Sequence, residues 1–152
     1  MALALKAEEQ ELLREEVAAF AAATRDPERR QQLEALTAMI DSGTLPDDAL
    51  EPIGHVLEIG LQTGRIRRVH RAAGEQALLR LFDKTPAGEA RAAALADINQ
   101  ALGQLAGQEV ESVRVLSRTP GTYLLMISTN ACELVLRFDP DGAQVESVAV
   151  GV

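Results

Sequence analysis

The hydrophobic period of this chain changes once, near Gly107, and this change limits the folds open to it. Before Gly107 the apolar residues recur every three to four positions, as they do on one face of a helix. After Gly107 they alternate or run continuously, which is typical of strands. A series of helices followed by a series of strands favours the α+β class, in which helices and sheet occupy separate parts of the chain.

An N-terminal helical layer of about five helices is predicted. Asp26 followed by Pro27 is a cap with proline at the first helical position, and Gly43 and Gly64 follow the last residues of helical patterns. Gly74 divides one pattern, which therefore forms one helix or two. The predicted segments are 3–25, 27–42, 46–64, 65–83 and 86–106.

The last 44 residues predict a four-stranded antiparallel meander. The strands are 109–118, 122–129, 131–138 and 143–152, and a turn of sequence Asp-Pro-Asp-Gly at 139–142 joins the last two. Val113 and Val115 are expected to point inward. The segment 122–129 is apolar on both faces, which predicts a central strand covered on both sides. The helix at 86–106 is expected to cover the sheet.

A chain of 152 residues is most simply one domain, with a helical part at 1–107 and a β-meander part at 108–152. A domain boundary near residue 84 or 107 is the alternative. The sequence has no apolar run of 18 residues and no secretory signal, so we expect no membrane association and a cytoplasmic protein. A single cysteine, Cys132, cannot form an internal disulfide, and we expect it to be buried and structural.

One basic segment stands out in an acidic chain. Residues 65–84 contain six basic and two acidic residues, a local net charge of +4 in a chain of −8. Arg65, Arg67, Arg68 and Arg71 are therefore the candidate binding residues for a phosphate or an acidic partner. The favoured alternative is that they pair with the acidic residues just before them: Asp47, Asp48, Glu51 and Glu58. The overall negative charge makes nucleic acid an unlikely partner.

Chemical motifs are missing from the sequence. The two histidines, His55 and His70, do not have the short spacings of metal ligands, and no nucleotide-binding loop or nucleophile motif is present. We therefore predict no catalytic residue, no metal and no cofactor. Aromatic residues make up only 3% of the chain, which disfavours functions that rest on base or sugar stacking.

The sequence therefore predicts a non-enzymatic interaction or scaffold protein that binds a protein partner or itself, with a homodimer expected. Val148, Val150 and Val152, on one face of the last strand, are the candidate interface. One alternative is a small-molecule binder with an apolar pocket between helices and sheet, using His55, Arg80 or Glu133. Another is a regulatory nucleic-acid binder that acts through the basic segment at Arg65–Arg71.

Overall fold

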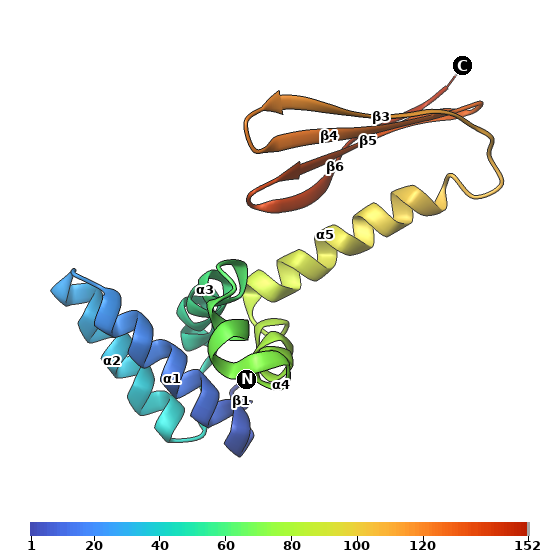
Figure 1. Ribbon diagram of the computed structural model, residues 1–152. Helices are drawn as coiled ribbons and strands as arrows, with labels where there is room; N and C mark the ends of the chain where they lie inside the picture. Colours follow the sequence, from blue (N-terminus) through green and yellow to red (C-terminus); the bar gives the residue numbers. More distant parts are fainter. Residues whose placement is uncertain (152) are drawn as a thin grey trace. The chain divides into compact units, whose positions relative to one another are not determined.

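A computed structural model describes residues 1–151 and confirms the α+β class (Figure 1). Five helices precede a four-stranded antiparallel sheet, and a small two-stranded sheet involves the N-terminus. In chain order the elements are β1 (Leu3–Ala4), α1 (Ala7–Ala23), α2 (Pro27–Asp41), β2 (Thr44–Leu45), α3 (Asp47–Gln62), α4 (Arg65–Phe82), α5 (Pro86–Gly103), β3 (Val110–Thr119), β4 (Thr122–Thr129), β5 (Cys132–Asp139) and β6 (Gly142–Val150).

The chain forms two compact units, Met1–Glu89 and Ala90–Val152. The first, called here the helical unit, contains α1 to α4 and the first residues of α5. The second, called the sheet unit, contains the rest of α5 and strands β3 to β6. The organisation of the chain as one folding domain remains a prediction.

The helical unit has a closed aliphatic core. Helix α2 begins as the sequence predicts: the Asp26 side chain accepts a hydrogen bond from the Glu28 backbone N at 3.1 Å, with Pro27 as its first residue. Each helix then turns its apolar stripe inward. The fully or almost fully buried core residues are Leu13, Val17, Leu33, Leu36, Ile40, Leu45, Ala49, Ile53, Val56, Leu57, Ile66, Leu78, Leu81 and Phe82.

The first predicted helix, 3–25, is shorter in the structure because its first residues form a strand. β1 pairs antiparallel with β2, with Leu3 opposite Leu45. The Glu9 carboxylate then accepts a hydrogen bond from the Lys6 backbone N at 3.0 Å and caps the start of α1. The short pair of strands ties the N-terminus to the segment between α2 and α3.

The break in α4 lies at Arg71 and not at Gly74. Arg71 has φ 61° and ψ −169°, a backbone conformation outside the helical region and rare for any residue with a Cβ atom. Gly74 is buried, and a Cβ atom there would overlap the side chain of His70. Glycine is therefore needed at position 74 for close packing after the break, while the break itself falls three residues earlier.

The sheet of the second unit is a simple meander with the strand order β3-β4-β5-β6. Residues that face each other in neighbouring strands share one face of the sheet. One such row contains Val113, Ile127, Leu134 and Val148, and the next contains Val115, Leu125, Leu136 and Val145. All eight are aliphatic, so this face is apolar along its length.

Helix α5 covers part of the apolar face. Ile98 and Ala101 of α5 form a buried cluster with Leu134 and Leu136 of β5, as expected for a helix that covers the sheet. Within residues 1–151, no helix is both long enough and apolar enough to cross a membrane.

Candidate functional site

The apolar face of the sheet is only half covered, and this corrects the prediction that Val113 and Val115 point into a core. Val113 and Val115 are 58% and 62% exposed, whereas Leu134 and Leu136, which lie in the same two rows on β5, are buried. The next residues on β4, Leu125 and Ile127, are half-buried. Strand β4 is central in the sheet, but it is not covered on both sides as the sequence suggested.

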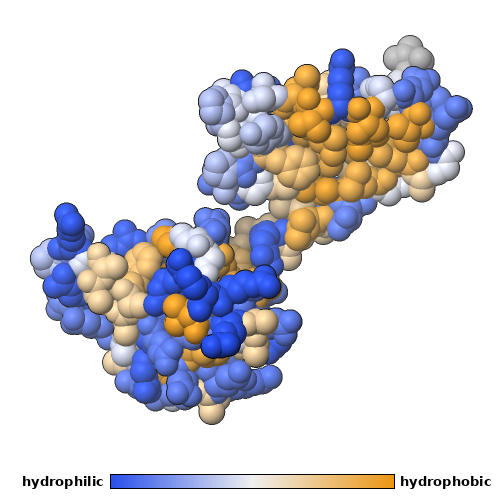
Figure 2. All heavy atoms as spheres, viewed as in Figure 1, coloured by the Kyte–Doolittle hydropathy of each residue, from blue (hydrophilic) through white to orange (hydrophobic). Residues whose placement is uncertain are grey.

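An open patch of six apolar side chains therefore lies on β3, β4 and the end of β5. Tyr123 is 49% exposed and faces Phe138 across the strand pair, in the same alternation as Leu125 and Leu136. Figure 2 shows apolar side chains gathered over the sheet. The open patch consists of Val113, Val115, Tyr123, Leu125, Ile127 and Phe138. Together these exposed fractions amount to on the order of 500 Å² of apolar surface, the size of the largest patch on a typical monomer.

The opposite face of the sheet carries paired charges. Glu146 forms ion pairs with Arg118 of β3 at 2.9 Å and with Arg137 of β5 at 3.2 Å. The Nε atom of Arg137 also lies 3.2 Å from the Asp139 carboxylate, but without the alignment of a hydrogen bond. The same face also carries Leu116, which is 44% exposed, and the half-buried Leu124 and Met126, so it is mixed in character.

Two of the three residues of the predicted valine interface are on the surface of β6. Val148 is partly exposed, and Val150 is 77% exposed. Val152 lies outside the described residues. Strand β6 is an edge of the sheet, as predicted, but so is β3, and the sequence reasoning did not select β3 as the more open of the two.

The basic segment is divided between a buried cluster and the surface. Arg65 forms an ion pair with Glu16 of α1, and His70 Nε2 lies 2.7 Å from the same carboxylate oxygen. His70 Nδ1 is 3.5 Å from Glu15, and the His70 side chain is only 5% exposed. These contacts attach the first turns of α4 to α1, so Arg65 and His70 have a structural role in the helical unit.

The other arginines of the segment are exposed. Arg67 lies 3.8 Å from Glu75 on its own helix, and within residues 1–151 neither Arg68 nor Arg71 forms an ion pair. The predicted acidic partners are engaged elsewhere or exposed; Asp47, for example, pairs with the N-terminal amine. The segment therefore pairs mainly with α1, and its predicted role in binding a phosphate remains untested.

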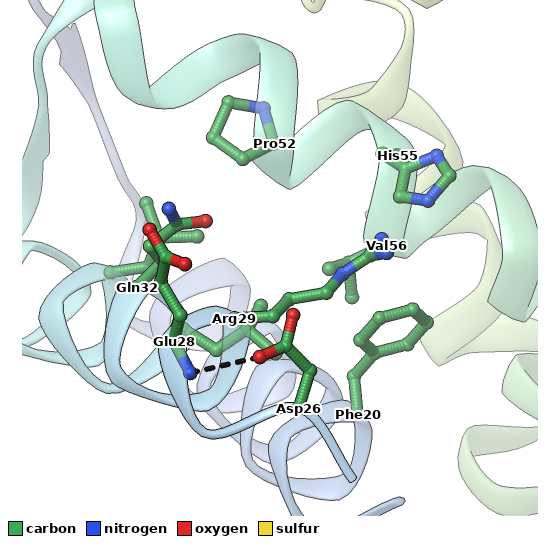
Figure 3. Close-up of a pocket in the computed structure, with 10 residues that line it drawn as sticks. Phe20, Asp26, Glu28, Arg29, Gln32, Pro52, His55 and Val56 are labelled. Carbon is green, nitrogen blue, oxygen red and sulfur yellow. Dashed lines mark hydrogen bonds between the residues drawn. The ribbon is translucent and has the colours of Figure 1, made fainter. Parts of the chain in front are cut away.

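A cleft of about 420 Å³ lies between the end of α1, the start of α2 and α3 (Figure 3). His55 lines it, together with residues that the sequence did not single out. The Phe20 ring meets the His55 ring edge to face, with centroids 6.2 Å apart, and the Arg29 guanidinium lies 5.7 Å from the Phe20 centroid. Leu33, Leu36 and Val56 form its buried apolar floor. In the sequence, the only sign of this cleft is that Phe20, an isolated aromatic residue, comes shortly before the helix cap at Asp26.

Cys132 is buried, as predicted. Its Sγ atom lies 3.3 Å from the Gln108 side chain and 3.5 Å from the Thr129 hydroxyl. The Thr129 hydroxyl also accepts hydrogen bonds from the backbone N atoms of Ala131 and Cys132 and so stabilises the loop before β5. Glu133 lies on the opposite face of the sheet, where it accepts a hydrogen bond from Ser128. Of His55, Arg80 and Glu133, the suggested acid and base of a pocket, His55 lines the cleft described above and the other two do not. In the described part of the chain no three His, Cys, Asp or Glu side chains gather as metal ligands.

Comparison with known proteins gives no relative: no family model, no curated protein and no solved structure matches this chain. The candidate sites therefore rest on the geometry of the open patch and of the cleft.

Proposed function

We propose that the protein acts by binding another protein chain, that the open patch is the binding surface, and that its first partner is a second copy of this chain. The observation that supports this is the exposure of Val113 and Val115 beside half-buried Leu125 and Ile127 in one register. The largest apolar patch on a typical monomer is of about this size and often has a function.

The size and composition of the open patch suit a contact between two copies. A standard interface buries about 800 Å² on each partner, and the open patch supplies more than half of that area. Because α5 occupies the same face over β5, two copies can meet only through the β3–β4 side of this face, where the side chains of both patches can interdigitate. The patch contains no charged residue, so the contact avoids the cost of burying unpaired charge.

Pairing along the strand edges is a weaker route to the same complex. The β3–β4 pairing has register shifts at both ends of β3, and the β5–β6 pairing has one between Val135 and Leu136. Such bulges bend an edge strand and interrupt the row of backbone groups that a further strand would use. Val148 and Val150 of β6 are separated from the open patch by the residues of β5 that α5 covers, so they lie outside this contact.

The test compares two substitutions at adjacent residues of β3. Sedimentation velocity of the wild-type chain across a hundredfold range of concentration should show a monomer–dimer equilibrium in the micromolar range. Val113→Glu places a charge in the open patch and should abolish the dimer. Ser112→Glu adds the same charge on the opposite face of the strand and should leave the dimer intact.

Two results would reject self-association through this surface. A wild-type chain that is a monomer at every concentration has no such dimer. A dimer that survives Val113→Glu but not Ser112→Glu uses the other face of the sheet. Circular dichroism spectra that match the wild type confirm that each variant is folded.

A further inference from the structure

The cleft in the helical unit has the composition of a small-molecule site and is separate from the open patch. Its volume of about 420 Å³ lies within the range of about 300–1,000 Å³ that is typical of ligand pockets. The floor is aliphatic and buried, with Val56 only 2% exposed. An apolar floor below a few polar side chains is the usual design of such pockets.

Arg29 is an exposed cation on the rim of this cleft. Its guanidinium packs over the Phe20 ring, but within residues 1–151 it forms no ion pair. The neighbouring Arg30, in contrast, donates a hydrogen bond to the Thr24 carbonyl at 2.7 Å. A guanidinium that is held against an aromatic ring and lacks an acceptor can bind a carboxylate with two parallel hydrogen bonds.

His55 provides a second polar group on the same side of the cleft. In Figure 3 the Arg29 side chain extends across the cleft toward His55, beside Phe20. The edge-to-face contact with Phe20 fixes the plane of the His55 ring, which is exposed and has no hydrogen-bond partner within the described chain. A ligand oxygen atom bound by Arg29 can therefore also accept a hydrogen bond from the His55 ring.

The acidic lining of the cleft limits the charge of the ligand. Asp26 also lines it, and its carboxylate is already used by the Glu28 backbone N. The Glu28 side chain lies on the side of Gln32, away from His55 (Figure 3). With these two carboxylates and one arginine the lining has a net charge of −1, so an anion must be of low charge and in direct contact with Arg29.

We propose that this cleft binds a small organic monocarboxylate with a flat or branched apolar body. The carboxylate pairs with Arg29 and receives a hydrogen bond from His55. The apolar body lies between Phe20 and Pro52, above the nearly buried floor of the cleft. This activity is independent of self-association, because every lining residue belongs to the helical unit.

The test is an NMR titration of the full ¹⁵N-labelled chain with phenylacetate. Amide signals of the cleft, such as those of Gln32 and Val56, should shift and saturate at low millimolar concentration. The neutral probe 2-phenylethanol, which has the same ring but no carboxylate, should bind about tenfold more weakly. Arg29→Gln should weaken phenylacetate binding about tenfold and leave 2-phenylethanol binding unchanged.

Arg68→Gln is the control, because it removes the same charge from an exposed arginine that has no ion pair within the described residues and does not line the cleft. It should leave both affinities unchanged. The proposal is overturned if phenylacetate causes no saturable shifts in the cleft, if both probes bind equally, or if Arg68→Gln weakens binding as much as Arg29→Gln. Since both arginines are exposed, both variants should keep the wild-type spectrum outside the cleft.

Discussion

The two units use similar aliphatic residues in opposite ways. The helical unit encloses its Leu, Ile and Val side chains among four helices, and its exposed large hydrophobic residues are Met1 and Val69 alone among the described residues. The sheet unit has a buried cluster of four residues, and nine of the eleven exposed large hydrophobic side chains belong to it. A half-covered sheet cannot bury a full apolar face, so this unit leaves apolar side chains in contact with solvent.

The largest expected difference between the units concerns the loss of one core side chain. Leu57→Ala should destabilise the helical unit by about 2–5 kcal/mol, because it leaves a cavity at a fully buried site. Val115→Ala should change the stability of the monomer by less than about 0.5 kcal/mol, as is usual for surface substitutions.

Urea titrations followed by two signals measure this difference. Ellipticity at 222 nm reports mainly on the helices, and the fluorescence of Tyr123, the only tyrosine, reports on the sheet. Leu57→Ala should lower the midpoint of the ellipticity transition, whereas Val115→Ala should move neither transition at a concentration where the chain is monomeric. Equal losses for the two substitutions would contradict the contrast between a closed and an open unit.

A smaller effect is expected from the buried cluster of the helical unit. Glu16→Ala leaves His70 and Arg65 without their shared acceptor and should cost about 1–3 kcal/mol. The cost is less than that of breaking a fully buried ion pair, because the Arg65 side chain keeps about a third of its surface in water. Thermal unfolding at neutral pH measures it. Glu15→Ala, at an exposed residue with a longer contact, is the control and should cost clearly less.

The smallest effect has the opposite sign. Arg71→Gly should stabilise the helical unit by about 1 kcal/mol, because glycine adopts a φ of 61° without the strain that a Cβ atom causes. Ala72→Gly, one residue later in regular helix, should destabilise it by about 1 kcal/mol. Opposite signs for the two changes in stability would show that α4 is broken at Arg71. If the helix were continuous there, both substitutions should destabilise the unit.

The sequence predicts the class of fold because the hydrophobic period is a local property of every element. The change of period near Gly107, the cap at Asp26 and the buried position of Cys132 all follow from residues close together in the chain. The two-residue strands β1 and β2 are too short to have a period. The break at Arg71 has no signal, because nothing in its residue type favours a positive φ.

The candidate sites were harder to predict because they depend on distant residues. Alternation places Val113 and Val115 on one face of a strand, but it does not indicate how far a helix extends over that face. The pairing of Arg65 with Glu16 joins residues 49 positions apart, so the nearer acidic residues were the natural choice. The cleft combines Phe20, Arg29 and His55 from three helices, and no spacing in the sequence connects them.

The charged face of the sheet decides how large an assembly can grow. A sheet that is apolar on both faces can stack layer upon layer into an open filament. In this protein the second face carries the Arg118, Glu146 and Arg137 ion pairs among its apolar side chains, so a further layer stacked on that face would have to bury those charges. The same three side chains that contribute little to the stability of one molecule would therefore set a finite stoichiometry for many.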